Sequence, residues 1–352
     1  MNFIQRGIDA WRKDHLLGRV VRNSSYLFIS NAISAVLSIV TANLLGVAEF
    51  GILGIIIAFV SNVNRLLSFR MSEFVVKYMG AAVAMGEKEK AAAIVKVAGF
   101  AETITSLFAY LVLIILTPFA AKYIAHDSGL MPLFFLYGIS ILSQFSTETA
   151  TGILQVSGHY RTQALINLVQ SLVTALGIVY AVIIHAGLFT VLLAYLVGKI
   201  ILGLGPILAA LYWLPRLLGT DWRQASLKAL PPRNEILRFA VSTNFSGTIN
   251  MVARDSEVLW VGYFFSPLIA GYFKTALAII NLVVMPVTPF IATTYPEIAQ
   301  SVATRQWIRL KNLLRRVTIL SGGWTLVVSF GLLLFGRQVL FNPVTILGKT
   351  IS

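Results

Sequence analysis

Hydrophobic residues along the chain gather into nine long runs separated by short polar stretches. Most of the runs hold about 20 residues or slightly more, the length that an α-helix needs to cross the hydrocarbon core of a bilayer. The pattern therefore predicts nine transmembrane helices, with ends uncertain by a few residues. The predicted spans are residues 24–46, 50–70, 97–118, 131–153, 164–184, 187–212, 239–264, 271–293 and 317–335.

Polar side chains inside five of these spans recur every three or four residues, which places them on one face of each helix. Interhelical hydrogen bonding could explain any single stripe. Two of the five stripes contain an arginine, and helix packing alone seldom requires a cation at depth. Taken together, the five stripes therefore favour a shared polar lumen. The stripes are Asn31, Ser34, Ser38 and Thr41; Ser61, Arg65, Ser68 and Ser72; Ser140, Gln144, Glu148, Thr151 and Gln155; Gln163, Asn167, Gln170 and Thr174; and Thr243, Ser246, Gly247, Asn250, Arg254 and Glu257.

The most polar of these stretches is Arg254-Asp255-Ser256-Glu257, which is followed by apolar sequence up to Lys274. A charge at the bilayer centre costs roughly 2.5 to 3.5 kcal/mol on insertion scales, so these groups should face other helices or a water-filled cavity. Arg254 and Glu257 are three residues apart and can pair. They form either a structural ion pair or part of a lumen. Four acids inside or beside the spans are candidate counter-charges or proton carriers for ion coupling: Glu102, Glu148, Asp255 and Glu257.

Composition agrees with the span pattern, since 57% of residues are hydrophobic and only 12% are charged, against roughly 25% in soluble proteins. The fold class is therefore all-α and integral to the membrane. With the amino terminus in the cytoplasm, the tail and the loops on that side contain 21 of the 28 lysines and arginines, against three outside: Lys122, Arg337 and Lys349. This asymmetry follows the positive-inside rule and accounts for the net charge of +14 without a nucleic-acid partner. With no cysteine and four scattered histidines, we expect neither a disulfide framework nor a metal site, and no motif indicates a cofactor.

The chain also repeats itself weakly, because Leu45-Gly46 and Phe50-Gly51 have counterparts in Val261-Gly262 and Ala270-Gly271, 216 to 220 residues later. Such an offset is typical of transporters built from two related bundles, here in parallel orientation. Applied to span four, the offset points to a tenth span beginning about residue 349, so we expect a second bundle with three of six helices, truncated or completed by a partner. The predicted division is a basic cytoplasmic amphipathic segment at 1–23, a first six-helix bundle at 24–213, a cytoplasmic linker at 214–238 and the partial second bundle at 239–352.

Three segments resemble Wzx-type polysaccharide flippases. They are the first hairpin, with Leu45-Gly46 and Glu49-Phe50-Gly51; Tyr295-Pro296-Glu297 before a basic helix; and a run with Asp255, Leu259, Gly262, Phe264, Ser266, Pro267, Gly271, Tyr272 and Ala276. The resemblance implies membership of the multidrug/oligosaccharidyl-lipid/polysaccharide exporter superfamily, with two six-helix bundles around a central, cation-lined cavity. It assigns a cavity role to Arg65 and, less directly, to Arg254, Lys199 and Lys274.

The resemblance further implies that the protein moves undecaprenyl-diphosphate-linked oligosaccharide across the cytoplasmic membrane by alternating access, for export of O-antigen, capsule or exopolysaccharide. Arginine suits a diphosphate because its planar fork makes paired, charge-assisted hydrogen bonds. The polar stripes, including Asn31 and Gln144, would serve the sugars. Membrane lipid is a further expected partner, with a polysaccharide polymerase and chain-length machinery as possible additions.

Two other functions remain open. An ion-coupled exporter of small cationic compounds would want an acidic lumen, whereas Arg65, Lys199 and Arg254 make this one mixed. A membrane polysaccharide polymerase usually needs a sizeable loop domain with positioned acids or a metal, while the longest loops predicted here, 71–96 and 213–238, are short and basic. There is no phosphate-binding loop of the G-x-x-x-x-G-K-[ST] type, so we expect a transporter without its own ATPase and not an enzyme.

Overall fold

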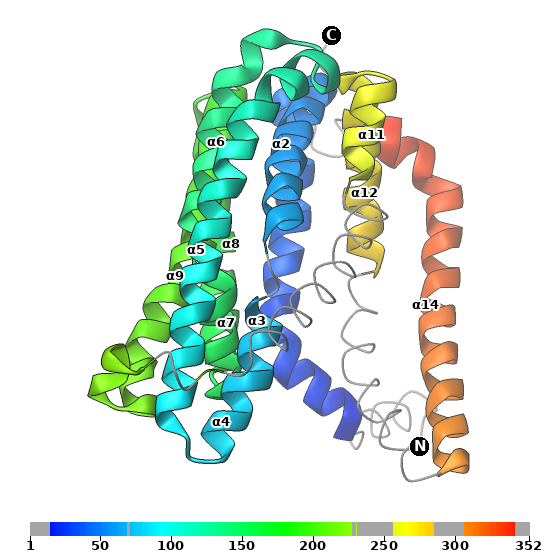
Figure 1. The fold of residues 1–352 in the computed structure, drawn as a ribbon. Coiled ribbons are helices and arrows are strands. Elements are labelled where there is room, and N and C mark those ends of the chain that lie inside the picture. Colours follow the sequence, from blue (N-terminus) through cyan, green and yellow to red (C-terminus); the bar gives the residue numbers. More distant parts are fainter. Residues whose placement is uncertain (1–14, 69–70, 227–229, 231–255, 285–305, 342–352) are drawn as a thin grey trace. The chain divides into compact units, whose positions relative to one another are not determined.

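The structure is a computed structural model that describes residues 15–68, 71–226, 230, 256–284 and 306–341, and these residues form helices and turns without a strand (Figure 1). The all-α fold class is thereby confirmed. The helices are α2 (His15–Leu67), α3 (Met71–Phe74), η1 (Val75–Met79), α4 (Gly80–Ala84), α5 (Lys88–Phe119), η2 (Ala120–Ile124), η3 (Ser128–Leu130), α6 (Met131–Ser143), α7 (Thr147–Val156), α8 (Tyr160–Ile183), α9 (Leu188–Leu218), η4 (Thr220–Gln224), α11 (Glu257–Phe264), α12 (Pro267–Val284) and α14 (Trp307–Phe341).

Five stretches of the described helices are long and apolar enough to cross a membrane. They overlap predicted spans one to six, with the second half of span one and span two joined in one stretch. The predicted total of nine extends into residues that the structure does not describe, so that number stays a prediction. The five stretches are Val36–Ala84, Lys88–Ile124, Ser128–Val156, Tyr160–Ile183 and Leu188–Leu218.

Helix α2 contains a break at Gly46, where the backbone is not helical (φ 75°, ψ 166°). This positive φ lies in the region that favours glycine, since a Cβ there would be strained. The break separates predicted spans one and two at the position where the first span was expected to end. Gly46 thus makes the first two spans separate helical segments.

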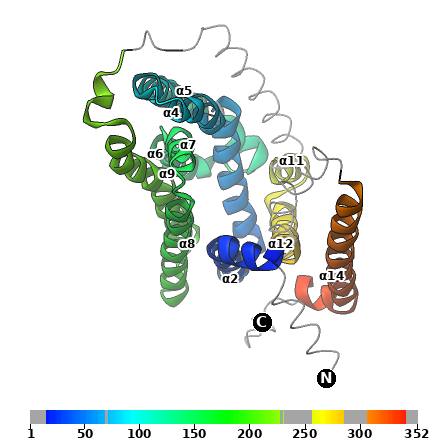
Figure 2. The same ribbon diagram turned by 90° about the horizontal axis from the view of Figure 1, so that it is seen from below.

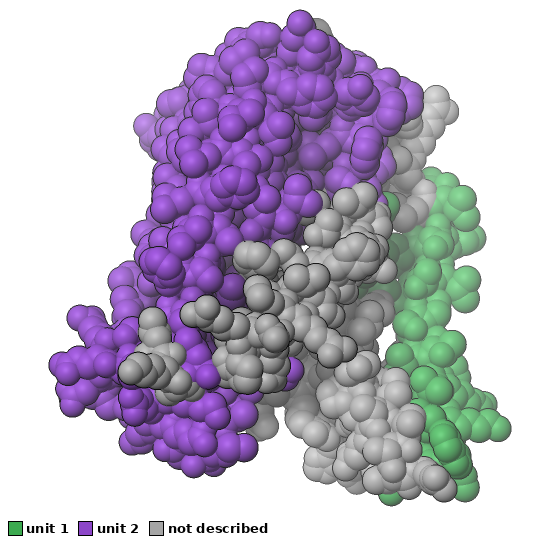
Figure 3. Space-filling model, viewed as in Figure 1, with its two compact units in different colours: residues 1–43, 275–352 green, residues 44–274 purple. Residues whose placement is uncertain are grey.

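The chain divides into two compact units, coloured separately in Figure 3. Unit 1 comprises Met1–Asn43 and Thr275–Ser352, and unit 2 comprises Leu44–Lys274. Each is described by itself below. The boundaries predicted from the sequence at residues 23, 213 and 238 stay predictions.

Unit 2 is a bundle in which α9 runs beside α8 and also contacts α6 and α7, while α5 packs on α6 (Figure 2). Helix α11 joins this bundle through η2, where the His126 Nε2 atom lies 2.9 Å from the Gly262 carbonyl oxygen. All the candidate site residues considered below, apart from Asn31, belong to this unit.

The prediction of a loop over residues 71–96 was wrong, because α3, η1, α4 and the start of α5 occupy it. Its charged residues Glu73 and Lys77 are exposed, whereas apolar residues between them and beyond, such as Phe74, Val75 and Met79, are buried. Those residues form a core with α5, α7 and α9, which holds this segment as helix. The last part of the segment belongs to α5, which begins at Lys88 and continues into span three.

In unit 1, α14 unites a basic segment that begins at Trp307 with the predicted span 317–335 in one helix of 35 residues. The indole Nε1 of Trp324 donates a hydrogen bond to the Val283 carbonyl oxygen at the end of α12, over 2.8 Å. This bond fixes α14 to the end of α12.

Candidate functional site

Two of the predicted lumen cations, Arg65 and Lys199, come from different spans and lie close enough to interact electrostatically. Arg65 is in the last turn of α2 and is exposed, and Lys199 is partly buried in α9. Like charges disfavour each other most strongly where water is scarce. An anion near the two side chains would relieve this repulsion.

A third predicted cation, Lys274 of α12, also meets α2. Its ammonium nitrogen lies 4.2 Å from the ring centroid of Phe50, in a cation–π contact. Its stem runs past Gly54, where an added Cβ would lie only 2.5 Å from the Lys274 Cδ atom. Because Gly54 and Arg65 are eleven residues apart, about three helical turns, they share one face of α2, about 16 Å apart. This face therefore meets cations at two levels.

Gly51 of α2 and Gly271 of α12 are the two glycines of the sequence repeat, and each lies against the helix of the other in unit 2. A Cβ on Gly51 would collide with the Pro267 carbonyl oxygen, and a Cβ on Gly271 would collide with the Val47 carbonyl oxygen. Gly271 and Pro267 stand 220 residues after Gly51 and Val47, so the contact is reciprocal. Two hairpins related by a two-fold axis would touch in this way, which supports the repeat offset read from the sequence.

The repeat symmetry fails at one position in this crossing. Adding 220 to Gly54 gives Lys274, so a glycine in one half corresponds to a lysine in the other, and the lysine occupies the space that the glycine leaves. The asymmetry places a single cation beside the crossing and against Phe50. Sequence reasoning proposed Lys274 but missed Phe50 and Gly54 as its neighbours. The repeat offset was the signal that could have identified Gly54.

Glu102 and Glu148, proposed as counter-charges or proton carriers, belong to one hydrogen-bonded network. Glu102 of α5 is 2% exposed, and its carboxylate accepts hydrogen bonds from the backbone N–H groups of Glu148 (2.8 Å) and Thr149 (2.9 Å). These groups lie in the first turn of α7, where a negative charge also complements the helix dipole. The Glu148 carboxylate in turn accepts from the Ser72 hydroxyl (2.7 Å) at the start of α3. The network links the beginnings of two helices.

Predicted span four is not one helix, and this corrects the expectation of a single polar face from Ser140 to Gln155. Helix α6 ends at Ser143 and α7 begins at Thr147. The turn between them is held from both sides, by the Thr147 hydroxyl donating to the Gly203 carbonyl oxygen of α9 (2.8 Å) and by the Thr103 hydroxyl of α5 donating to the Phe145 carbonyl oxygen (3.3 Å). Neighbouring helices thus satisfy the backbone groups that the break exposes.

We predict that Glu102→Ala lowers the free energy of unfolding by roughly 1 to 3 kcal/mol, because two buried N–H groups of α7 lose their acceptor. Denaturation of the purified protein in mixed micelles measures this change. The control is Glu87→Ala, since Glu87 is exposed and pairs with Lys90 on the surface, where such a pair contributes little. Equal stability of the two variants would contradict a capping role for Glu102.

The remaining predicted residues divide into three groups. The Gln144 amide donates to the Ser140 carbonyl oxygen (2.8 Å) where α6 ends, which is a local role. Glu257 is the first residue of α11 and partly exposed, and Asn31 lies on α2 with its side chain outside the description. Arg254 and Asp255 lie outside the described residues, so the proposed Arg254–Glu257 pair stays a prediction.

Part of the polar stripe on span five faces another helix and not a lumen. Thr174 of α8 is 3% exposed and receives a hydrogen bond from the Gln170 amide (3.2 Å). A Cβ at Gly198 of α9 would collide with the Thr174 hydroxyl. Thr174 therefore packs against α9, while its hydrogen bond to Gln170 stays within α8.

Among the residues that the structure describes, no group of three or more histidine, cysteine, aspartate or glutamate side chains could hold a metal ion.

A search of solved structures places this fold among known transporters. The chain is similar to a structure described as the inward-facing conformation of a multidrug resistance MATE family transporter of the MOP superfamily, with a TM-score of 0.63 at 15% identity. The similarity covers 90% of this chain and 71% of that one. At this identity the similarity establishes the fold alone.

Sequence comparison narrows the class further. Residues 40–341 match the profile of the family described as polysaccharide biosynthesis protein, and the chain belongs to this family. It is also 23% identical over 348 residues to the inner membrane protein YghQ of Escherichia coli (strain K12), an alignment that covers 95% of this chain and 94% of that protein. The resemblance to Wzx-type flippases is thus supported by both the family and the fold.

Proposed function

We propose that this protein translocates undecaprenyl-diphosphate-linked oligosaccharide across the cytoplasmic membrane by alternating access, for export of O-antigen, capsule or exopolysaccharide. The membrane-spanning helices, the fold and the polysaccharide biosynthesis family support the class of transporter. The cations at the candidate site support the choice of a diphosphate-linked substrate. In this proposal the amino terminus is cytoplasmic, and a polymerase and chain-length machinery receive the product.

The observation that carries the proposal is the match of residues 40–341 to the polysaccharide biosynthesis family. The electrostatic interaction between Arg65 and Lys199, which belong to two spans, supports the choice of substrate. Two neighbouring cations match a diphosphate, which carries charge on both phosphoryl groups, and the arginine fork can bind it in a paired geometry. Lys274 adds a second cationic level about three turns along α2. In this proposal the prenyl tail stays in the lipid while the polar head group crosses the membrane along the polar side chains of the protein.

An exporter of small cationic compounds fits less well, because a cation approaching Arg65 and Lys199 would meet like charge. The Glu102 carboxylate is already occupied by the backbone of α7, so it does not offer the compensating negative site. A polymerase would need a positioned acid or base near its substrate, and Glu148 is engaged with Ser72.

The direct test uses the purified protein in liposomes that contain a fluorescent lipid-linked oligosaccharide. Reduction of the label by a membrane-impermeant quencher distinguishes the two leaflets. We expect the protein to make the inner pool accessible, and a matched lipid whose head is a cationic sugar without diphosphate to stay in place. Movement of the cationic lipid, with no movement of the diphosphate lipid, would overturn the proposal.

Lys199→Met provides a more specific expectation, because methionine keeps most of the apolar stem and removes the charge. Loss of the repulsion from Arg65 should raise the free energy of unfolding, by about 0.5 kcal/mol on the scale of helix surface pairs, while it weakens transport. Unfolding in mixed micelles and the liposome assay measure the two quantities. A variant that is both less stable and fully active would contradict this role of Lys199.

A further inference from the structure

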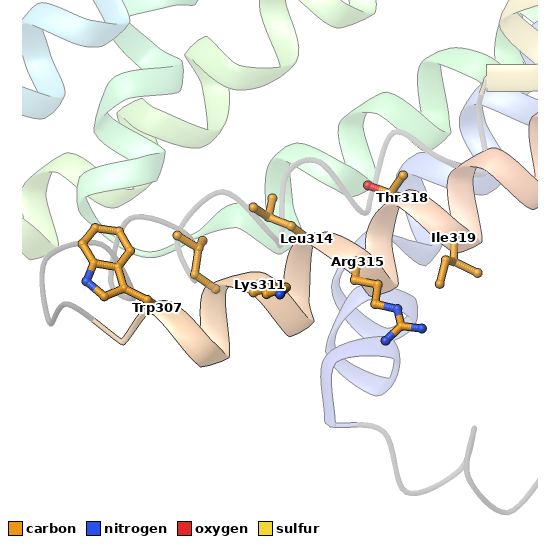
Figure 4. A pocket seen from close by; sticks show the side chains of 7 residues that line it. Trp307, Lys311, Leu314, Arg315, Thr318 and Ile319 are labelled. Carbon is orange, nitrogen blue, oxygen red and sulfur yellow. The ribbon is translucent and has the colours of Figure 1, made fainter.

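A groove of about 550 Å³ runs along the beginning of α14, and its described lining belongs to that helix (Figure 4). It lies between two rows of side chains with i, i+4 spacing, which form neighbouring ridges on a helix surface. One row is Trp307, Lys311, Arg315 and Ile319, and the other is Leu310, Leu314 and Thr318.

The cations of the groove lie between an aromatic side chain at one end and an aliphatic side chain at the other. Trp307 is at one end, the cations Lys311 and Arg315 follow one and two turns later, and Ile319 is at the other end. Trp307 is 59% exposed and Ile319 is 61% exposed, so large apolar surface remains uncovered beside the cations. Tryptophan with basic residues at the start of a membrane span is the composition of an interfacial segment.

The charge of this segment is strongly one-sided. Residues 307–316 include four lysines and arginines, and the sequence from 306 to 341 has no aspartate or glutamate. Beyond the groove the same helix continues into exposed apolar side chains, among them Leu326, Val327 and Phe330. A ligand here therefore meets cations at its head and hydrocarbon along its tail.

From this arrangement we propose that the α14 groove binds an anionic phospholipid of the surrounding leaflet. Its phosphate lies between Lys311 and Arg315, and its glycerol and acyl chains follow Leu314 and Ile319. Anionic lipid headgroups attract basic juxtamembrane residues, and the indole of Trp307 suits the headgroup level. The site is independent of the proposed transport function, because Arg65 and Lys199 take no part in it.

The test measures quenching of Trp307 fluorescence by brominated lipid in the full-length protein reconstituted in nanodiscs. The Trp307 signal is the difference between the protein and its Trp307→Phe variant. We compare brominated phosphatidylglycerol with brominated phosphatidylcholine, each in a phosphatidylcholine bilayer. The wild type should prefer phosphatidylglycerol, and Lys311→Gln with Arg315→Gln should reduce that preference by roughly 30-fold, on the scale of about 1 kcal/mol per basic residue.

Two matched variants make the result specific. Lys311→Arg with Arg315→Lys keeps both charges and should keep the preference. Lys88→Gln with Arg161→Gln removes the same two charges from exposed positions of unit 2 and should leave the preference unchanged. Loss of the preference in either of these variants would overturn the assignment to Lys311 and Arg315.

A last pair of measurements identifies the source of the phosphate group. Inorganic phosphate in the buffer should leave the quenching unchanged, because it has no chains to occupy the apolar end of the groove. Displacement of brominated phosphatidylglycerol by a trace of polyprenyl diphosphate would overturn the proposal in favour of a substrate site. Equal quenching by the two brominated phospholipids in the wild type would overturn it altogether.

Discussion

Replacing Arg65 by alanine is expected to abolish export of the glycan while the protein reaches the membrane at its normal level. Arg65 is exposed at the end of α2 beside Lys199, so the fold does not depend on packing of its side chain. A hydrogen bond to a charged group contributes about 1.5 to 3 kcal/mol, and its loss weakens binding of a diphosphate by roughly 10- to 150-fold. Arg65→Lys keeps the charge without the paired geometry and should be partly active.

The measurement is surface glycan in cells that depend on this protein, with immunoblotting of the membrane fraction for its amount. Arg161→Ala is the matched control, because Arg161 is an exposed arginine at the start of α8. It should export normally. Full export by Arg65→Ala, or equal loss in both variants, would remove Arg65 from the site.

The hydrophobic pattern predicted the helices well where a span is one continuous apolar run. It could not predict the break between α6 and α7, because the run from Met131 to Val156 is interrupted only by polar residues that also suit a helix face. The break is stabilised by partners far away in the sequence, namely Glu102, Thr103 and Gly203. Such partners are not visible in local periodicity.

The sequence was sufficient to predict which cations lie inside the membrane spans. It was not sufficient to predict which side chains lie next to them. A positive charge inside an apolar run is conspicuous in any sequence, so Arg65, Lys199 and Lys274 were identified. The electrostatic interaction of Arg65 with Lys199 and the contact of Lys274 with Phe50 depend on the tertiary arrangement of the helices, which local sequence does not reveal. The acids behaved differently, since Glu102 and Glu148 accept hydrogen bonds from backbone N–H groups and from a hydroxyl.

Glycine gave the strongest long-range signal. Gly51 and Gly271 were recognised only as landmarks of a weak repeat, yet the structure brings their helices into backbone contact. A residue without a side chain allows two membrane helices to approach closely. The contact requires residues without a Cβ at both positions, so glycine marks the offset of 220 residues in the sequence.

Alanine at either glycine is expected to force the two helices apart. In Gly271→Ala the new Cβ would overlap the Val47 carbonyl oxygen, and in Gly51→Ala it would overlap that of Pro267. Backbone atoms in helices cannot turn away as a flexible side chain can, so each variant should lose about 1 to 3 kcal/mol of unfolding free energy or more. Denaturation of the purified protein in mixed micelles measures this loss.

The double variant provides the sharper result, because both substitutions act on one crossing. Once the first alanine has separated the helices, the second meets less resistance, so the combined loss should fall short of the sum of the single losses by about 0.5 to 3 kcal/mol. Gly323→Ala on α14 is the control, since a Cβ there has no heavy atom within 4 Å. That substitution should instead stabilise the helix, by about 0.5 to 1 kcal/mol. Strict additivity of Gly51→Ala and Gly271→Ala would show that the two glycines do not share a contact.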